Sequence, residues 1–501
     1  MAEVPIPFLG RNAPLDVRTN YGVDIAVEDD LRSIMSFALL EREAWFEDEV
    51  AFLQRALPKG AYIADVGANV GVYSAALAHA AGPHGRVVAV EPHPVAGALL
   101  ARNAAAACQA PIHAERRAVA AGAGRQSFRF GTSSELSGLV DGGGDIEVET
   151  VALDALIGDL GWPRLDFLKI DVEGAEEAAL AGAARTLADA DPVVMLEVNN
   201  CGIFDFAPLA TLAAHGYVPY RLVPGLDMLA PMPQSKDLVS LNAFAVKPTR
   251  AAELEARGFL ATRVPDAADA QAVPQAEIDA AFLAYVEALA PFRQNAALAR
   301  RWRAAFASPA ARDYLAGCAD LVAARNQALA PCVRAGLLER AQKNLVAAAR
   351  ARPSAARATS LLSCMLALGN QAAVRSMGQS LLDAATGPAD FTPDEPLVVP
   401  FARFESLCRG GDAAAWLKAV AFTFCLEQYD YTTKFMPDAT LQLAAEIAEL
   451  GYASAASERR RQLCAMVLGR QTGPVASPLF DGTDETFRNR DLWRVAVADR
   501  R

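Results

Sequence analysis

The sequence has no long apolar runs. Charge, Gly or Pro interrupts each apolar stretch well before the about 18 residues that suggest a membrane-spanning helix. The first residues, Met1–Pro7, lack the basic start and apolar core of a secretion signal. We therefore expect a protein without a membrane span that stays in the cytoplasm.

Positive charge is also scarce. The chain has 47 Lys and Arg residues against 59 Asp and Glu residues, which gives a net charge of -12. This charge would repel a phosphate backbone or an anionic lipid surface unless a basic patch were present, and the sequence indicates none. We expect neither nucleic acid nor membrane as a partner. Only seven of the basic residues are Lys and Ala is abundant, a bias typical of a GC-rich bacterial genome.

The sequence has no CxxC pair and no His at zinc-finger spacing. Its eight cysteines are scattered along the chain. Because disulfides are rare in cytosolic proteins, reduced and mostly buried thiols are expected. A disulfide framework and a zinc finger are excluded.

The chain has a globular composition over 501 residues, 53% of them hydrophobic. This excludes disordered, collagen-like and coiled-coil classes. Up to about residue 248, β-branched runs alternate with Ala/Leu-rich helical stretches, which is typical of a parallel α/β sheet. We predict a doubly wound, mostly parallel sheet of seven strands, at residues 61–66, 86–91, 112–119, 166–171, 193–198, 217–222 and 239–246.

An inserted hairpin is predicted between the third and fourth strands. Gln126–Phe130 and Ile146–Val151 alternate with period two on either side of the Gly-rich turn Asp141–Asp145. We expect the tip of this hairpin to cover a pocket.

The strand pattern stops at Pro248, and Ala/Leu/Arg-rich helices follow. Gly336 and Gly369 are 33 residues apart and each is predicted to open an Ala-rich helix, which indicates either a tetratricopeptide-like repeat or an ordinary helical bundle. Aromatic residues near the end, including Trp493, predict a tail that docks onto the protein. The expected parts are a lead-in segment (1–40), an α/β domain (41–248), a linker (249–274), an all-α domain (275–470) and a C-terminal tail (471–501).

The turn Asp65–Gly71 follows the first strand and precedes a helix. Gly67 and Gly71 allow a tight turn and close approach of a ligand, and the helix N-terminus offers free N–H groups. With Asp65 and Asn69, these glycines are the predicted cofactor-binding turn. A packing turn without a ligand is the alternative.

Glu91 ends the second strand, 24 residues after Gly67. A carboxylate at this place can accept both hydroxyls of a ribose. The Gly67-x-x-x-Gly71 spacing departs from GxGxxG, and an acid at the turn suits a cationic amino-acid end better than a pyrophosphate. S-adenosylmethionine is therefore favoured over NAD. His93 is predicted to lie beside the adenine, with an exposed loop position as the alternative.

The run Asp166–Glu176 brings charge to the next strand end. Lys169 and Asp171 point to the same side of the strand, and Asp171 ends it at the edge where such sheets bind ligands. We predict Lys169, Asp171 and Glu173 as catalytic residues. A structural ion pair between Lys169 and Asp171 is the alternative.

The following strand brings Glu197 and Asn199 to the same edge. Asp171, Glu197 and Asn199 offer the oxygen ligands that Mg²⁺ prefers, so Mg²⁺ is a second candidate cofactor. The competing interpretation makes Asp171 or Glu197 a general base without a metal.

At this point the chain resembles the FkbM family of S-adenosylmethionine-dependent methyltransferases, over about residues 15–248. The resemblance rests on Trp45–Val50, Asp65–Gly71, Val90–Pro92, Val151–Asp154, Asp166–Glu176 and Glu197. It implies a class I, Rossmann-like methyltransferase fold and methyl transfer to a hydroxyl oxygen of a sugar, glycan or polyketide-like metabolite.

The resemblance also implies roles for individual residues. Asp65, Gly67, Asn69 and Gly71 would surround the methionine part of the cofactor, and Glu91 would hold the ribose. Asp171, Glu173 and Glu197 would face the acceptor. This chain departs from the family at His93, where Asn is common.

The favoured function is thus O-methylation of a hydroxylated acceptor, with the helical domain docking substrate, binding a protein partner or mediating self-association. The alternative is an inactive methyltransferase-fold scaffold, against which the intact Asp65, Glu91 and Asp171 argue. N- or C-methylation is a further possibility, and the glycine spacing disfavours a nicotinamide oxidoreductase.

Overall fold

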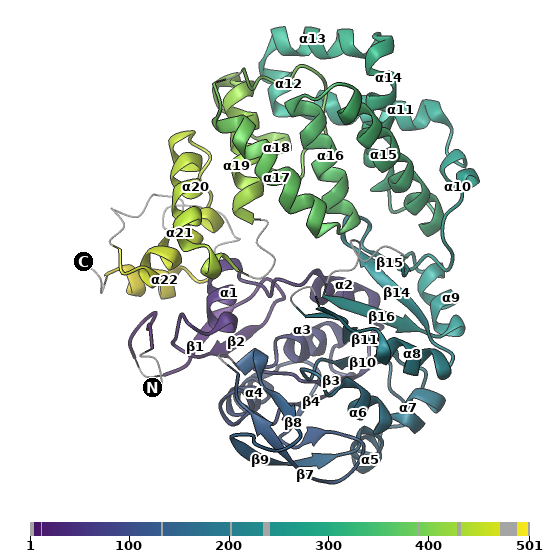
Figure 1. Ribbon diagram of the computed structural model, residues 1–501, viewed down its shortest axis with the longest axis vertical. Coiled ribbons are helices and arrows are strands. Elements are labelled where there is room, and N and C mark those ends of the chain that lie inside the picture. Colours follow the sequence, from purple (N-terminus) through teal and green to yellow (C-terminus); the bar gives the residue numbers. More distant parts are fainter. Residues whose placement is uncertain are drawn as a thin grey trace. The chain divides into compact units, whose positions relative to one another are not determined.

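The computed structural model describes residues 5–11, 13–131, 134–200, 203–233, 241–388, 390–427, 432–470 and 488–498 (Figure 1). The chain forms two compact units. The first, here called the sheet unit, comprises Met1–Tyr220, Leu241–Glu253 and Glu458–Arg501. The second, the helical unit, comprises Arg221–Ser240 and Leu254–Ser457. Each unit is therefore assembled from segments that are distant in sequence.

The main sheet has eight strands, in the order β15-β14-β16-β11-β10-β3-β4-β5. Its central strands are parallel, and β16 lies antiparallel between β11 and β14. The bounds are β3 (Tyr62–Val66), β4 (Arg86–Val90), β5 (Ile112–Glu115), β10 (Phe167–Ile170), β11 (Val193–Glu197), β14 (Val218–Val223), β15 (Met228–Pro231) and β16 (Asn242–Val246). The division between the units falls within β14, so that β15 is counted with the helical unit.

The predicted count of seven strands was wrong. The eighth, β15, follows a 3₁₀ turn (Pro224–Leu226) and contains only four residues, none of them β-branched, so it gave no strand signal. The predicted strand 112–119 is also interrupted after Glu115, and Ala118–Val119 forms β6 in another sheet. The α/β class itself is confirmed, and β3, β4, β5, β10 and β11 of the sheet run parallel to one another.

The order of the parallel strands creates a switch point at the middle of the sheet. From β3, the chain continues to β4 and β5 on one side and returns to β10 and β11 on the other. Ligands of such sheets bind outside the carboxyl ends of the strands, where the order reverses. The helices of this unit are α1 (Ile34–Arg42), α2 (Asp48–Ala56), α3 (Val72–Ala81), α4 (Pro94–Ala106), α5 (Leu153–Asp159), α6 (Glu176–Ala181), α7 (Ala184–Asp189) and α8 (Ala207–Ala214).

The predicted hairpin is part of a four-stranded sheet ordered β6-β9-β7-β8. Strands β7 (Gly124–Arg129) and β9 (Ile146–Val151) pair in antiparallel fashion, and β8 (Gly138–Val140) extends the sheet beyond β7. Two small pairs complete the strands of the unit: β1 (Leu15–Arg18) with β2 (Asp24–Val27), and β12 (Asn199–Asn200) with β13 (Ile203–Phe204).

The end of the chain returns to the sheet unit. Arg459 and Arg460, on α21 (Ala455–Val467), donate to the backbone oxygen and the carboxylate of Glu41. On α22 (Arg490–Ala498), Trp493 is fully buried and packs edge-on against Phe8. The other aromatics predicted to dock the tail, Phe480 and Phe487, lie outside the described residues.

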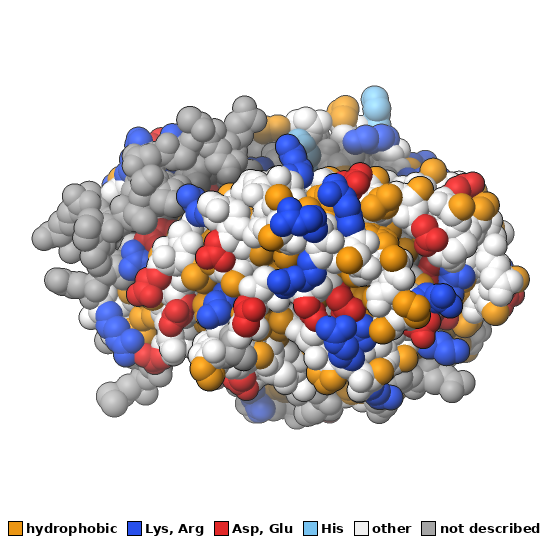
Figure 2. Space-filling view, turned by 90° about the horizontal axis from the view of Figure 1, so that it is seen from above, with side chains coloured by type: hydrophobic (Ala, Val, Ile, Leu, Met, Phe, Trp, Pro, Cys, Tyr) orange, Lys and Arg blue, Asp and Glu red, His pale blue; other side chains and the backbone are white. Residues whose placement is uncertain are grey.

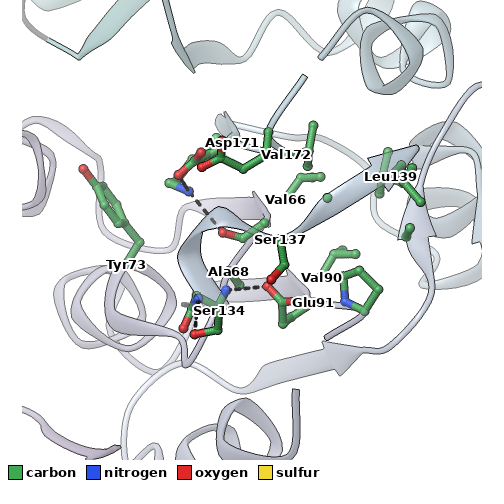
Figure 3. Close-up of a pocket in the computed structure, with 18 of the residues that line it drawn as sticks. Val66, Ala68, Tyr73, Val90, Glu91, Ser134, Ser137, Leu139, Asp171 and Val172 are labelled. Carbon is green, nitrogen blue, oxygen red and sulfur yellow. Dashed lines mark hydrogen bonds and ion pairs between the residues drawn. The ribbon is translucent and has the colours of Figure 1, made fainter. Parts of the chain in front are cut away.

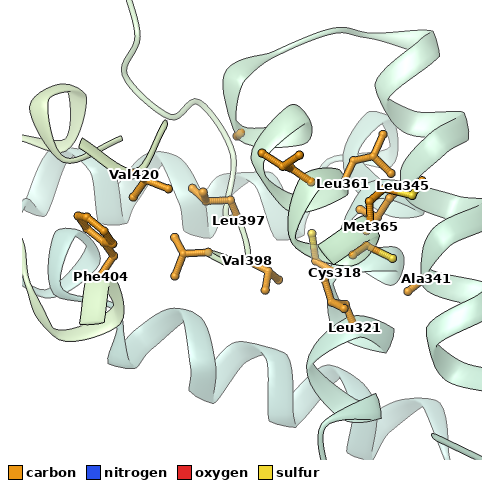
Figure 4. Packing of buried hydrophobic residues seen from close by; sticks show 14 of the residues in the cluster. Cys318, Leu321, Ala341, Leu345, Leu361, Met365, Leu397, Val398, Phe404 and Val420 are labelled. Carbon is orange, nitrogen blue, oxygen red and sulfur yellow. The ribbon is translucent and has the colours of Figure 1, made fainter. Parts of the chain in front are cut away.

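The helical unit stacks successive helices side by side (Figure 1). Its helices are α10 (Ala267–Gln271), α11 (Gln275–Ala288), α12 (Ala290–Gln294), α13 (Ala296–Phe306), α14 (Arg312–Ala324), α15 (Pro331–Ala351), α16 (Ala355–Leu368), α17 (Gln371–Thr386), α18 (Arg403–Ser406), α19 (Ala413–Glu427) and α20 (Pro437–Glu449), after α9 (Pro248–Ala256). Side chains such as Cys318, Leu345, Met365 and Val420 form one continuous core (Figure 4). In the described part of the chain, no helix has both the length and the apolar character needed to cross a bilayer.

The two glycines that suggested a repeat have different positions. Gly336 lies inside α15, where a Cβ would meet Asp269 and Ala270 at 3.1 Å, whereas Gly369 caps the end of α16 with a φ of 74°. Neither opens a helix as the sequence predicted, because Gly336 is needed for close packing and Gly369 for a left-handed cap.

Charged side chains of both signs lie on the face shown in Figure 2, where Lys and Arg gather near the middle with Asp and Glu among them. In the helical unit, exposed arginines concentrate on α12, α13 and the start of α14. They are Arg293, Arg300, Arg301, Arg303 and Arg312.

Candidate active site

A cavity of about 830 Å³, part of it open to solvent, lies at the carboxyl ends of β3, β4 and β10 (Figure 3). These strands meet at the switch point of the main sheet. The described residues that line the cavity all belong to the sheet unit. The predicted edge of the sheet is therefore where the cavity forms.

The turn after β3 requires glycine at residue 67. Gly67 has a φ of 80°, and a Cβ built on it would lie 1.7 Å from the backbone oxygen of Asp171. The ends of β3 and β10 can approach each other only because this side chain is missing. Gly71, with a φ of 89°, precedes α3, and its Cβ would meet Leu100 at 2.6 Å. Gly67 lines the cavity, whereas Gly71 shapes the turn from behind.

Asn69 holds the turn to the loop between β7 and β8. Its backbone has a φ of 50°, an uncommon conformation for a residue other than glycine. Its Nδ2 donates to Ser134 Oγ at 3.1 Å, and its Oδ1 accepts from the backbone N–H of Val70. Ser134 and Ser137 line the cavity, so the loop that leads into β8 covers it, and not the Asp141–Asp145 tip that the sequence favoured.

Glu91 presents a buried carboxylate to the cavity. One oxygen accepts the backbone N–H of Asn69 at 2.9 Å and the other accepts that of His93 at 2.7 Å. Burial raises the pKa of this carboxyl to about 7, although both hydrogen bonds favour its charged form. Glu91 is thus the residue that fixes the start of the β4 loop and faces the cavity from that strand.

Asp65 and His93 are not among the described residues that line the cavity. Asp65 is fully buried and accepts from Ser74 Oγ at 2.5 Å, and its other oxygen lies 3.7 Å from Lys169 Nζ. Burial raises its pKa. His93 caps α4 by accepting the N–H of Ala96 through Nδ1, with its ring 5.0 Å from that of Phe130. Both residues support the site from outside the cavity.

Lys169 is the central cation of the site. Its Nζ lies 2.9 Å from Asp171 Oδ2 and 3.2 Å from the backbone oxygen of Gly67. In the register of the sheet it stands opposite Asp65. These carboxylates raise its pKa although burial lowers it. The ammonium therefore stays charged, and the ion pair that the sequence left as an alternative is present.

Three carboxylates converge beside this lysine. Asp171, Glu173 and Glu197 each place an oxygen within 4.8 Å of the others. Burial, and then the neighbouring Asp171 and Glu173, raise the pKa of Glu197 to about 9. Asp171 and Glu173 line the cavity; Glu173 has a φ of 50°. Asn199, the third predicted metal ligand, follows on β12 and donates its backbone N–H to Leu241.

Sequence reasoning missed the aromatic part of the cavity. Trp45 and Tyr73 line it, and both donate to the carboxylate of Glu47, Trp45 through Nε1 at 2.9 Å and Tyr73 through its hydroxyl. Asn242, on β16, adds a third hydrogen bond to Glu47 at 3.0 Å. The segment Trp45–Val50 belonged to the motifs of the resemblance, but nothing in its pattern indicated contact with α3 or β16.

An open α/β sheet with a glycine turn, a buried strand-end acid and a cavity at the switch point is the arrangement in which proteins of the doubly wound class bind their ligands. Residues 65–219 match the family model described as the methyltransferase FkbM domain. The match confirms the resemblance over these residues.

The chain is also similar to the crystal structure of a methyltransferase FkbM from Methylobacillus flagellatus KT, with 16% sequence identity and a TM-score of 0.27. The match covers 38% of this chain and 44% of that one, so the chain spans less than half of the length of that structure. No curated protein matches the sequence.

Proposed function

We propose that the FkbM domain is an S-adenosylmethionine-dependent methyltransferase that methylates a hydroxyl oxygen of a sugar, glycan or polyketide-like acceptor. The observation that carries this proposal is that Glu91 and Asp171 reach one cavity from β4 and β10, the strands on either side of β3. Glu91 is suited to bind a nucleoside, and Asp171 is suited to act as an acid or a base.

The residues present fit the cofactor. Each oxygen of Glu91 accepts one backbone N–H, and a carboxylate offers about four acceptor positions. Two positions are left for the two ribose hydroxyls. Gly67 allows the backbone to approach a ligand closely, and Asn69 ties the covering loop to the turn. Asp65 and Gly71 would support the methionine end indirectly, by holding Lys169 and the start of α3.

When bound, the cofactor supplies an activated methyl group, so the protein must mainly align the acceptor oxygen and remove its proton. Asp171 is the candidate base, because it lines the cavity and its side chain remains one-third exposed. Glu197, with a pKa of about 9, is protonated at neutral pH and can donate a hydrogen bond to the acceptor. Lys169 is a positioning residue, and Glu173 a candidate acceptor contact.

Replacing Asp171 tests this assignment. We expect Asp171→Asn to lower turnover at least 100-fold, the size of a general-base contribution of about 10² or more. Its affinity for S-adenosylhomocysteine should stay within about tenfold, or 1.4 kcal/mol. The matched control is Asp159→Asn, at the end of α5 and outside the described cavity lining. Full turnover of Asp171→Asn would assign the base to another residue.

A second route to the same proton loss uses Mg²⁺ held by Asp171, Glu197 and Asn199, where the ion would acidify the acceptor hydroxyl. The close approach of the carboxylates supports it. Chelation separates the two routes. Loss of turnover in excess chelator and recovery with Mg²⁺ would favour the metal, and unchanged turnover would exclude it.

Cofactor binding should be measured first, by calorimetric titration of the full chain with S-adenosylmethionine, S-adenosylhomocysteine and NAD. We expect micromolar binding of the two sulfur nucleosides and none of NAD. If no sulfur nucleoside binds, the proposal fails and an inactive scaffold becomes the better interpretation.

A further inference from the structure

Trp45 and Tyr73 form an aromatic wall of the cavity. Tyr73 follows the glycine turn on α3 and is buried, and Trp45 belongs to the segment before α2. In Figure 3, Tyr73 lies at the left, and Asp171, Glu91 and Leu139 follow in that order toward the right. If Glu91 binds the ribose, this wall therefore stands toward the other end of the cofactor.

The two rings of the wall share one anchor. The carboxylate of Glu47 accepts the indole Nε1–H of Trp45 with one oxygen, and the Tyr73 hydroxyl and the amide of Asn242 with the other. Glu47 is not among the described residues that line the cavity. The rings that it holds are therefore its direct contact with the cavity.

The surroundings of the wall are negative and electron-rich. The ammonium of Lys169, 5.3 Å from the centre of the Tyr73 ring, is faced by both Asp65 and Asp171. A single cation is thus outnumbered by carboxylates. Aromatic faces attract cations, most strongly where water is excluded. The rings and carboxylates at this end of the cavity therefore favour a positively charged group of a ligand.

We propose that Glu47 is a positioning residue that holds Trp45 and Tyr73 against the sulfonium of S-adenosylmethionine, so that the wall distinguishes the charged cofactor from its neutral product. This inference rests on the proposed function. It adds to it a means of releasing S-adenosylhomocysteine, which has the same nucleoside and amino-acid ends but a thioether in place of the sulfonium.

The ratio of the two affinities tests the proposal. Calorimetry with S-adenosylmethionine and S-adenosylhomocysteine compares the parent chain with Trp45→Leu, Tyr73→Leu and Glu47→Gln. We expect each variant to weaken binding of the cation about tenfold and of the thioether at most threefold. Trp162→Leu, which removes a tryptophan outside the described lining, should leave both affinities unchanged.

Tyr73→Phe keeps the ring and removes only its hydrogen bond to Glu47, so it provides a variant with little risk to folding. It should shift the ratio in the same direction as Glu47→Gln, and the double variant should shift it no further than Glu47→Gln alone.

The outcomes separate the two proposals. Equal loss of both ligands in the ring variants, or a parent-like ratio in Glu47→Gln, overturns the sulfonium role while leaving the methyltransferase intact. If the parent chain binds neither ligand, the proposed function fails, and this inference fails with it.

Discussion

Buried charge is matched in a structural ion pair of the helical unit and unmatched at the candidate site of the sheet unit. In the helical unit, Arg357 and Glu395 are both buried, and the guanidinium donates to both carboxylate oxygens at 2.7 and 2.9 Å. It also donates to the backbone oxygens of Ala348 and Ala310. Each charge is neutralised and surrounded by hydrogen bonds, so this pair joins α16 to the segment between α17 and α18 and has no capacity left for a ligand.

At the candidate site of the sheet unit, the buried ammonium of Lys169 faces more than one carboxylate. Asp65 and Asp171 both lie within ion-pair distance of Lys169. Glu173 and Glu197 lie beside Asp171 and add further acidic groups. Burial, and then these neighbouring carboxylates, raise the pKa of Glu197. Uncompensated charge at strand ends, more than burial of charge, therefore separates the candidate site from the structural core.

The most severe way to break the site is at Gly67. Gly67→Ala places a Cβ against the Asp171 backbone at a positive φ, and we expect it to cost about 4 kcal/mol of unfolding free energy and to abolish cofactor binding. Urea unfolding measures the cost. Gly161→Ala is the control, because it has a φ of 65° and nothing within 4 Å of its Cβ, and should cost about 1–2 kcal/mol. Equal costs would show that the close approach is unimportant.

Breaking the Arg357–Glu395 pair of the helical unit should lower the stability of the protein without changing its affinity for the cofactor. Arg357→Met leaves the buried Glu395 with the longer contact from Arg352, at 3.4 Å, and we expect a loss of about 3 kcal/mol in urea unfolding, with S-adenosylhomocysteine affinity unchanged. Arg350→Met, at an exposed position on the preceding helix α15, should cost little. Replacing both Arg357 and Glu395 by Met should recover most of the loss. A large change in cofactor affinity would contradict the separation of structural and functional charge.

The acidic residues of the candidate site could be predicted from the sequence, because they lie at the ends of strands. Acids at the ends of buried β-branched runs indicated Glu91, Asp171 and Glu197, and parallel strands bring their carboxyl ends to one edge. The helical spacing of Leu337, Ala341, Leu345 and Ala348 in the sequence likewise predicts one apolar face, and all four are buried on α15.

Contacts between distant segments could not be predicted. Asp65 was expected at the cofactor, but its register opposite Lys169 turns it into a buried partner of that lysine. The anchoring of Trp45 and Tyr73 by Glu47, and the return of α22 to Phe8, depend on side chains meeting across the fold. No periodicity in one segment encodes where another segment will lie.

Glu91 should make the affinity for S-adenosylhomocysteine depend on pH. Its pKa of about 7 means that the carboxyl gains a proton as the pH falls below 7, and a protonated acid is a weaker acceptor for ribose hydroxyls. S-adenosylhomocysteine affinity should therefore fall between pH 8 and pH 6, approaching tenfold per pH unit below the pKa. Calorimetry in Glu91→Gln should show weak binding without this slope. His93→Asn should keep the slope, and its loss there would assign the titration to the histidine.

The smallest expected effect is on stability at Glu197. The pKa of its carboxyl in the folded protein, about 9, lies above the ordinary value of 4.5, so the folded state holds the proton more tightly than the unfolded chain. Its contribution to stability is full below pH 4.5 and is lost as the pH rises through 9. Glu197→Gln cannot ionise, so at pH 9 it should be more stable than the parent, with the gain shrinking toward pH 5. Urea unfolding across this range measures the difference, with the exposed Glu177→Gln as control. If the free energy of unfolding varies with pH in the same way for Glu197→Gln and the parent, the acidic groups around Glu197 are balanced by positive charge. The candidate site would then resemble the Arg357–Glu395 pair of the helical unit.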